Sequence, residues 1–597
     1  MNKKYSEYKS LGAQIVSKKK ETGTLFSVWA PHATSVRVVG DFNHWYGEYH
    51  SMIKKDKTGI WSLFIPDLGP GTAYKYEIIT PNGKRFHKID PVAFSTGVSP
   101  DFSCRVVDLS EYEWSDKQWI KVKRKQDKWQ QPISIYELHP GSWRRYNNGN
   151  YYSYIDMADS LVDYVKCLGY THIELMPIME HPFDGSWGYQ CTGYFAPNSR
   201  FGSPSEFMYF IDCCHQSGIG VILDWVPSHF CRDEHGLAWY DGSPCYEYKT
   251  YKRSVKNRWG SNNFILEQPK IQSFLISSAL FWLDKYHIDG IRVDSVADIF
   301  NDRNRGKDVG AKFLRKLNKV IDERFPGTLT IAEDSSVRHL ITSDCNNGIG
   351  FTYCWNMGWT HDILKYMRHK PEERKNFHRE LMFTLEYAHN ENFVLSLSHD
   401  EMACGRGSLM EKMPGTAAER LANLKLLLAW QTVHPGKKLL FMGGELALEE
   451  SWHCDRQLNW DRLRYKKIQN LHRLVQQLNK LYSTQPALWQ VDKGQQGTVI
   501  QSSDHENSTV ILRRQGWDAS DSIIIAANFS NRKLNNYWLG TPSLGSYQVI
   551  FSTKNEQLDK KNAPCQEVQS ESCHWQGQPY RVSLNLPALS LLMIKKA

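Results

Sequence analysis

Four short segments of this sequence carry acidic residues, arginine or histidine directly after apolar, strand-like runs. In chain order they span residues 223–229, 290–294, 330–334 and 397–401. A strand that ends on a carboxylate delivers that group to one rim of a parallel barrel, and barrel enzymes build their active sites at that rim. The pattern therefore predicts that Asp294, Glu333 and Asp400 meet there, which is an arrangement suited to attack on a glycosidic bond.

The order of the segments assigns a role to each carboxylate. A retaining glycosidic reaction needs a nucleophile and a proton donor about 5 to 5.5 Å apart. Asp294 and Glu333 end the fourth and fifth predicted strands, which are neighbours in a barrel, so we predict Asp294 as the nucleophile and Glu333 as the acid/base. Arg292 shares a strand face with Asp294 and is expected to keep it ionised, while burial and a nearby anion raise the pKa of Glu333. Asp400 is the third carboxylate, expected to stabilise positive charge on the sugar ring.

Three further polar residues are expected around this group. His229 and His399 can donate hydrogen bonds to sugar hydroxyls, and Asp224 could hold Arg292 or its loop in place. Each has a structural alternative, because a lone aspartate at a strand end often caps a helix or pairs with a cation, and a lone histidine is usually a satisfied structural residue. The joint occurrence of four such segments favours the functional interpretation.

The elements that must position these residues are predicted as alternating strands and amphipathic helices, the βα pattern of a parallel sheet. The strand candidates are residues 133–138, 172–178, 221–226, 290–293, 328–332, 351–355, 393–397 and 439–442. Residues 269–285 have apolar residues close to helical spacing and predict one of the intervening helices. The fold class is therefore α/β, with a central (β/α)8 TIM barrel over 132–484. The polar excursion 230–263 is too long for an ordinary βα loop and predicts a small subdomain over the rim.

Short strand-like runs separated by turn residues flank the barrel on both sides. They predict an N-terminal β-sandwich over 1–110 and a C-terminal β-sandwich over 485–597. The polar, basic stretch 111–131 is predicted as the linker between the first sandwich and the barrel.

Composition narrows the class of protein. Of 597 residues, 41% are hydrophobic and 23% are charged, with no apolar run near the ~20 residues of a membrane-spanning helix. The polar N-terminus has no secretory h-region, so a cytoplasmic location is expected. The net charge of +9 is spread over a long chain, which argues against a nucleic-acid partner. The 13 cysteines are scattered and form no Cys-x-x-Cys pair, so reduced thiols are expected and no metal-binding pattern stands out.

The four segments resemble the signature regions of the alpha-amylase superfamily, and their surroundings are similar to glycogen (1,4-alpha-glucan) branching enzymes. The similarity covers nearly the whole chain and is carried by residues 136–139, 141–143, 180–190, 192–197, 355–359 and 407–415. Residues 40–45 resemble the glycan-binding sandwich of these enzymes, and residues 528–529 and 586–587 their C-terminal β-domain. The resemblance implies the same three catalytic roles and makes Tyr194 the residue that stacks on the sugar being cleaved. The positions expected to contact or support that sugar are Asp224, His229, Arg292 and His399.

By this resemblance the chain is expected to cleave an α-1,4-glucan and to transfer the segment to a glucose 6-hydroxyl, which forms an α-1,6 branch in glycogen. The expected partner is the α-glucan itself, with no cofactor and no second subunit, so that a monomer is predicted. Two alternatives remain at this point. One is a hydrolase of the same superfamily, either trehalose-releasing or debranching, and the other is a non-catalytic glucan-binding protein. The segments 301–310 and 443–448 depart from the family pattern, so the length of the transferred chain is not predicted.

Overall fold

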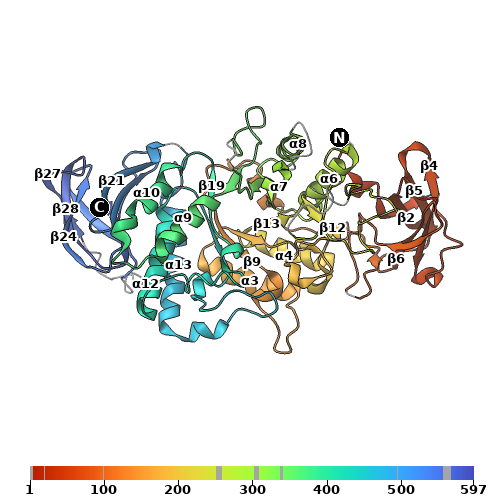
Figure 1. Ribbon diagram of the computed structural model, residues 1–597, viewed down its shortest axis with the longest axis horizontal. Helices are drawn as coiled ribbons and strands as arrows, with labels where there is room; N and C mark the ends of the chain where they lie inside the picture. The colour runs from red at the N-terminus through yellow and green to blue at the C-terminus, as the bar shows by residue number, and fades with distance from the viewer. Residues whose placement is uncertain are drawn as a thin grey trace.

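The barrel lies between two β-sandwiches placed at opposite ends of an elongated molecule (Figure 1). The computed structural model describes residues 4–18, 21–98, 100–250, 259–301, 308–336, 340–493, 495–554 and 567–597. The predicted fold class is confirmed: a closed eight-stranded parallel barrel stands at the centre, with all-β units before and after it.

The barrel strands pair in chain order and close between the last strand and the first. They are β9 (Ser134–Leu138), β10 (His172–Leu175), β13 (Gly220–Trp225), β16 (Gly290–Val293), β17 (Leu329–Ala332), β18 (Tyr353–Trp355), β19 (Phe393–Leu397) and β20 (Lys437–Phe441). Each of the eight predicted strands is present, with ends displaced by at most three residues. The neighbouring strands β16 and β17 therefore bring the second and third acidic segments side by side.

Amphipathic helices cover the outside of the barrel. The longer ones are α3 (Tyr154–Leu168), α4 (Pro204–Gln216), α6 (Pro269–Lys285), α8 (Val309–Arg324), α9 (Met357–Arg368), α12 (Ala417–Val433) and α13 (Lys466–Thr484). The sequence sets their ends directly. Ser153 and Ser203 begin α3 and α4 as capping boxes, and Gly169 ends α3 in a left-handed conformation. The predicted helix 269–285 is α6, residue for residue.

The barrel interior changes character along its axis. Toward the amino ends of the strands it is filled by apolar side chains such as Ile135, Ile331 and Leu439. Toward the carboxyl ends the inward side chains become ionisable. Asp224 on β13 lies directly opposite Arg292 on β16 in the strand register. Because inward and outward positions alternate along a strand, this register fixes both groups inside the rim.

Both flanking units are two-sheet sandwiches. In the N-terminal unit one sheet has the order β1-β2-β5-β4 and the other contains β3, β6, β7 and β8. These strands are β1 (Gly12–Lys18), β2 (Glu21–Trp29), β3 (Ser35–Gly40), β4 (Ile53–Lys55), β5 (Ile60–Pro66), β6 (Ala73–Ile79), β7 (Arg85–Lys88) and β8 (Cys104–Arg105). In the C-terminal unit a six-stranded sheet, β21-β22-β23-β29-β25-β26, faces a three-stranded sheet, β24-β28-β27. These strands are β21 (Thr498–Asp504), β22 (Thr509–Gln515), β23 (Ser522–Asn528), β24 (Leu534–Thr541), β25 (Ser546–Ser552), β26 (Glu567–Gln569), β27 (Glu571–Trp575), β28 (Gln578–Leu586) and β29 (Ser590–Lys596).

The predicted linker 111–131 is more than a connection. It contains the helix α1 (Lys117–Lys123), which packs across the amino-terminal end of the barrel. Trp119 Nε1 donates to Asp289 Oδ1 at 2.9 Å, and Lys123 Nζ lies 2.9 Å from the same oxygen. The buried Asp289 thus has two partners from this segment, which anchor it to the barrel.

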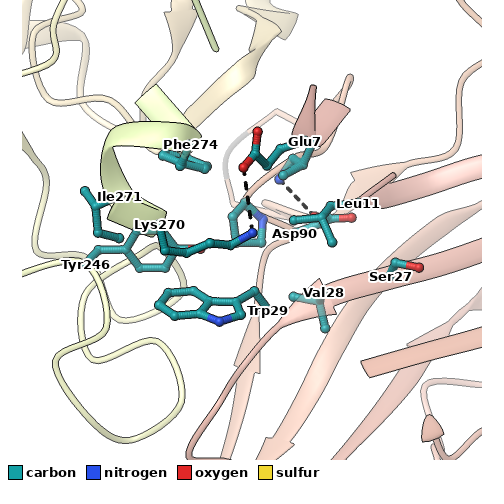
Figure 2. Close-up of a pocket in the computed structure, with 12 residues that line it drawn as sticks. Glu7, Leu11, Ser27, Val28, Trp29, Asp90, Tyr246, Lys270, Ile271 and Phe274 are labelled. Atoms are coloured by element: carbon teal, nitrogen blue, oxygen red, sulfur yellow. Dashed lines mark hydrogen bonds and ion pairs between the residues drawn. The ribbon is translucent and has the colours of Figure 1, made fainter. Parts of the chain in front are cut away.

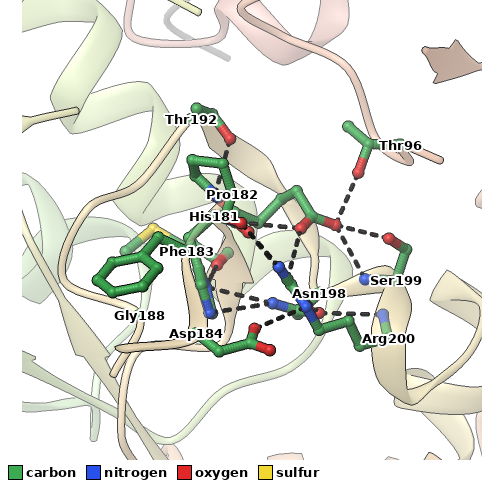
Figure 3. Close-up of polar contacts among 12 residues, drawn as sticks. Thr96, His181, Pro182, Phe183, Asp184, Gly188, Thr192, Asn198, Ser199 and Arg200 are labelled. Carbon is green, nitrogen blue, oxygen red and sulfur yellow. Dashed lines mark hydrogen bonds and ion pairs between the residues drawn. The ribbon is translucent and has the colours of Figure 1, made fainter. Parts of the chain in front are cut away.

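A buried carboxylate joins the N-terminal sandwich to the barrel. Glu180, in the short strand β11 (Met179–Glu180), accepts a hydrogen bond from Thr96 Oγ1 of the sandwich at 2.7 Å. The same carboxylate accepts Ser199 N at 3.0 Å and lies 3.2 Å from Arg200 Nη1. Figure 3 shows these three partners gathered around one group. The interface is therefore held by a saturated, charge-compensated network rather than by apolar contact alone.

A second contact between the same two units lies around the start of α6 (Figure 2). Lys270 Nζ is 3.7 Å from Glu7 Oε1 of the N-terminal segment. Beneath this pair, Trp29 of β2 meets Tyr246 edge to face, with ring centroids 5.8 Å apart. Tyr246 belongs to the 230–263 excursion, so that excursion also touches the sandwich.

The described part of the predicted rim excursion packs against the N-terminal sandwich. Lys88 Nζ donates to Ala238 O at 2.7 Å, and Tyr240 OH donates to Ile89 O at 2.9 Å. Residues 251–258 of the excursion lie outside the described residues. Residues 302–307, in the segment 301–310 that departs from the family pattern, also lie outside them. Within the described chain, none of the helices combines the length and hydrophobicity needed to traverse a bilayer.

Candidate functional site

A cavity of about 400 Å³ opens at the carboxyl ends of the barrel strands. Six of the eight predicted site residues line it, namely His229, Arg292, Asp294, Glu333, His399 and Asp400. The other two, Asp224 and Tyr194, lie behind its wall. The three predicted catalytic carboxylates therefore face one space, which is the geometry that the sequence required.

Arg292 is the centre of this group. Its Nη1 donates to both oxygens of Asp224 at 2.7 Å and to Asp294 Oδ1 at 2.8 Å, and its Nη2 lies 3.2 Å from Glu333 Oε2. The guanidinium lies over the ring of Trp355, 4.4 Å from the ring centroid. One fully buried cation thus fixes Asp294 and Glu333 relative to each other and is itself held by Asp224 from below.

The backbone after β16 completes the position of Glu333. Ser295 adopts a left-handed conformation with φ of 51°, which is uncommon for a residue with a side chain. In this conformation its N–H donates to Glu333 Oε2 at 2.7 Å. Because the contacts from Arg292 and Ser295 both go to Oε2, Oε1 is the oxygen on which a transferable proton can sit.

Burial sets the proton affinity of the two central carboxyls. It raises the pKa of Asp294 well above its usual value and also raises the pKa of Glu333, while Arg292 opposes the rise in both. Asp400 adds to the upward shift of the pKa of Glu333. The predicted upward shift of the pKa of Glu333 is therefore confirmed. The expectation that Arg292 keeps Asp294 ionised is wrong for the substrate-free cavity, because burial raises the pKa of Asp294 more than Arg292, which three carboxylates share, lowers it.

His399 is held as a charged donor at the edge of the cavity. Its backbone N–H donates to Glu137 Oε2 at 2.9 Å, and its Nδ1 bonds to the other oxygen of that buried carboxylate. Burial by itself lowers the pKa of His399, but the charges of Glu137 and Asp400 outweigh burial and raise that pKa to about 9. At neutral pH the ring is an imidazolium whose Nε2 lies 3.1 Å from Tyr189 OH.

This raised pKa predicts a pH-dependent stability. The pKa of His399 in the folded state lies above its unfolded value of about 6.5. The contribution of the protonated ring to the free energy of unfolding is therefore fully present below pH ~6.5 and is lost as the pH rises through about 9. The shift corresponds to about 3 kcal/mol. We expect the thermal midpoint of the wild type to fall more steeply between pH 6.5 and 9 than that of His399→Gln. Parallel melting curves over this range would contradict the assignment.

The structure corrects the predicted stacking residue. Tyr194 is fully buried, and its hydroxyl donates to His229 O at 2.8 Å and Val226 O at 3.2 Å, so it supports the loop that carries His229. The half-buried ring that reaches the cavity is Tyr189, whose hydroxyl donates to Asp224 Oδ2 at 2.6 Å. The sequence interpretation chose the wrong tyrosine from the right stretch, because strand β12 (Gly193–Pro197) turns Tyr194 toward the helices.

Substitution of the two tyrosines separates their roles. Tyr189→Phe removes the hydroxyl that bonds to the buried Asp224, which should cost about 1.5 to 3 kcal/mol of transition-state stabilisation and lower kcat/KM about 10- to 100-fold. Tyr194→Phe should lower the thermal midpoint while leaving kcat/KM within about threefold of wild type. Steady-state kinetics and thermal melts on both variants test this, and the reverse pattern would restore Tyr194 to the site.

Sequence analysis missed other residues that shape the cavity. Trp187 and Trp259 line it, and Trp259 stacks on His229 with ring centroids 4.9 Å apart. Ser261 Oγ lies 2.9 Å from His229 Nδ1. Trp187 belongs to the stretch 180–190 that carries the family resemblance, but no role was assigned to it, and the only signal for Trp259 was the abundance of aromatic side chains, which does not distinguish a cavity wall from a core.

Comparison with known proteins agrees with this architecture. Residues 10–93 match the family model Carbohydrate-binding module 48 (Isoamylase N-terminal domain). Residues 138–259 match the Alpha amylase, catalytic domain, and residues 499–597 the Alpha amylase, C-terminal all-beta domain. Among solved structures, the pullulanase from Bacillus acidopullulyticus superposes with a TM-score of 0.75 at 19% identity, covering 98% of this chain and 75% of that one. At this identity the likeness concerns the fold.

Relatives with curated names are far more similar in sequence. The 1,4-alpha-glucan branching enzyme GlgB of Bacillus caldolyticus is 42% identical over 99% of this chain and 90% of the relative. The enzyme of the same name from Halothermothrix orenii is 43% identical over 99% of this chain and 96% of the relative. Identity of this extent, over all three units including the barrel that holds the cavity, shows that the chain belongs to the family of 1,4-alpha-glucan branching enzymes.

Proposed function

We propose that this protein forms α-1,6 branches in an α-1,4-glucan by a two-step transfer, with Asp294 as nucleophile and Glu333 as acid/base. In the first step Asp294 attacks C1 of an internal α-1,4 bond, and Glu333 Oε1 gives its proton to the departing 4-oxygen. The carboxylate of Asp400, on the other side of the cavity, stabilises the positive charge that develops on the ring. Burial raises the pKa of both carboxyls, and attack requires an ionised Asp294 and a protonated Glu333.

The second step reverses the proton movement. Glu333 takes a proton from the 6-hydroxyl of an acceptor glucose unit, and the hydroxyl oxygen displaces Asp294 from C1 with overall retention of configuration. Water competes for the same intermediate, so the acceptor must be held in line while bulk solvent is kept away. The rings of Trp187 and Trp259 are placed to form such walls. Each step is a proton or glycosyl transfer between side chains and sugar, and neither needs a cofactor.

One observation carries this proposal. Asp294 and Glu333 come from adjacent strand ends and contact neighbouring nitrogens of the same buried guanidinium, facing a cavity wide enough for a sugar chain. The name of the relatives, 1,4-alpha-glucan branching enzyme, favours branch formation over hydrolysis as the outcome. The N-terminal sandwich, which matches a carbohydrate-binding module, supports an α-glucan as the partner.

Incubation with amylose tests the outcome of the reaction. Transfer leaves the total glucan and the number of reducing ends nearly constant while new α-1,6 linkages accumulate, which linkage analysis of the product measures. A steady rise in reducing ends without new branches would instead identify a hydrolase. The matched blank is the same incubation with Asp294→Asn.

We also propose that the protein acts as a monomer in the cytoplasm; for the monomer, the support is that Asp294, Glu333 and Asp400 line one cavity within a single barrel. Light scattering coupled to size exclusion tests the monomer. A mass of about twice 69.3 kDa at working concentration would reject it.

A further inference from the structure

Three side chains that can bind a metal ion meet where the N-terminal sandwich touches the 230–263 excursion. His32 lies in the turn between β2 and β3, while Asp241 and Cys245 belong to the excursion. His32 Nδ1 is 3.2 Å from Asp241 Oδ2 and 3.9 Å from Cys245 Sγ. All three potential ligand atoms lie within 4.8 Å of one another. None of the three residues lines the catalytic cavity, and none takes part in the reaction described above.

These separations suit a tetrahedral zinc ion. Zinc bonds of about 2.0 to 2.1 Å to nitrogen, 2.0 to 2.2 Å to oxygen and 2.3 Å to sulfur, at tetrahedral angles, place nitrogen about 3.3 Å from oxygen and about 3.6 Å from sulfur. The nitrogen to oxygen distance already matches within about 0.1 Å. The sulfur of Cys245 lies 3.9 Å from His32 Nδ1 and within 4.8 Å of the carboxylate oxygen, so it must move inward by up to about 1 Å to complete the tetrahedron.

Burial and charge also favour a cation here. The side chain of Asp241 is fully buried, and Cys245 is 2% exposed. Within the described residues, His32 is the only basic side chain at ion-pair distance from Asp241. A buried carboxylate without a full countercharge is costly, and a divalent cation would supply that charge.

We propose that His32 Nδ1, Asp241 Oδ2 and Cys245 Sγ bind one zinc ion. A water molecule completes the tetrahedron, because the side chain of His32 is 61% exposed and opens the site to solvent on that side. On binding, the S–H bond of Cys245 breaks, its proton leaves to solvent and a Zn–S bond forms, with no change of oxidation state. The mixed nitrogen, oxygen and thiolate set suits zinc better than magnesium or calcium, which prefer oxygen ligands.

The position of the ion links the sandwich to the catalytic cavity. The excursion leaves the cavity just after His229 and returns at Ser261, whose hydroxyl bonds to the His229 ring. An ion bound to His32 on one side and to the excursion on the other therefore ties the glycan-binding unit to the segment that positions His229. The inferred role is to stabilise that segment.

The competing account is a hydrogen-bond network without metal. Ser243 Oγ donates to Asp241 Oδ1 at 2.6 Å and lies 2.8 Å from His32 Nδ1, and His32 N donates to Asp241 Oδ2 at 2.7 Å. In that account the cluster only fastens the interface. The two accounts differ in whether the full-length protein takes up a transition metal through a thiolate.

Cobalt titration of the chelator-treated full-length protein tests the proposal. Co²⁺ is the probe because a thiolate ligand gives it an intense near-ultraviolet charge-transfer band and tetrahedral ligation gives it strong visible bands. We expect these bands to saturate at one Co²⁺ per chain and to be displaced by Zn²⁺. Cys245→Ser should abolish the charge-transfer band, whereas Cys404→Ser, which removes an exposed cysteine elsewhere, should keep it. An unchanged band in Cys245→Ser, or no band in the wild type, would overturn the proposal.

A second variant removes a ligand without touching the buried side chains. His32→Ala keeps the backbone N–H that donates to Asp241, so the fold should persist. We expect it to weaken Zn²⁺ binding more than about tenfold and to abolish the zinc-dependent rise in thermal midpoint. The matched control is His87→Ala, an exposed histidine of the same sandwich, which should retain both. Equal zinc affinity in the two histidine variants would show that His32 is not a ligand.

Discussion

Asp294→Asn is expected to lose branching activity by about 10⁴-fold or more, because the covalent step has no other nucleophile. The substitution keeps the shape of the side chain, so Arg292 and the cavity should remain in place. Glycogen binding, measured by native gel mobility in glycogen, should stay close to wild type. The loss therefore falls on kcat and not on association with the glucan. Activity is measured as new α-1,6 linkages formed from amylose.

Asp334→Asn is the matched control for that variant. Asp334 directly follows Glu333, but its carboxylate accepts Ser336 N at 3.0 Å and Ser336 Oγ at 2.8 Å, outside the cavity lining. We expect its kcat to remain within about fivefold of wild type. Substantial branching by Asp294→Asn, with Asp334→Asn inactive, would show that the nucleophile has been assigned to the wrong carboxylate.

Glu333→Gln is expected to lower activity on amylose by about 10² to 10⁴-fold, the usual contribution of a general acid. A donor with a fluoride leaving group, such as α-maltosyl fluoride, needs little protonation. On this donor the first step should proceed, and fluoride should appear in a burst equal to the enzyme concentration. The second step lacks its base, so a maltosyl group should accumulate on Asp294, and mass spectrometry of peptides locates it.

The two catalytic variants thus fail in different ways. Asp294→Asn should show no burst with α-maltosyl fluoride, since no covalent bond can form at that position. A burst in Asp294→Asn, or the absence of a burst in Glu333→Gln, is incompatible with the proposed division of roles.

The strands and the domain order could be predicted because local sequence determines them. The eight barrel strands are short apolar runs separated by helices, and each run is bounded by polar or turn residues, so their number and order follow from periodicity. The helix in the predicted linker was missed because α1 has only seven residues and no buried side chain of its own. Its place is set by contacts with Asp289 from far along the chain, which local pattern does not reveal.

The site was predictable where a strand end fixes the direction of a side chain. Arg292, Asp294 and Glu333 follow from the strand alternation and from the adjacency of β16 and β17. Tyr189 and Tyr194 lie in loop and strand only five residues apart, and which ring enters the cavity depends on the turn between them. Sequence gives no rule for that turn.

The cluster of His32, Asp241 and Cys245 shows the same limit more strongly. His32 is separated from Asp241 and Cys245 by about two hundred residues and belongs to a different structural unit, so no local spacing pattern could reveal the three together. The expectation that no metal-binding pattern stands out is a statement about neighbouring residues. Only the packing of the excursion on the sandwich brings these three together.

The Glu180 network also bears on how such enzymes can be recombined. Replacing the sandwich by that of a relative would have to preserve a hydroxyl at position 96, or the barrel would keep an interface carboxylate with one acceptor site unfilled. A buried acceptor left without its hydrogen bond costs about 1 to 3 kcal/mol of folding stability. A chimera joined within the 111–131 segment should consequently keep a hydroxyl at residue 96 as well as a suitable junction. The fit between a foreign sandwich and this barrel depends on the interface around Glu180, which lies far from the junction in sequence.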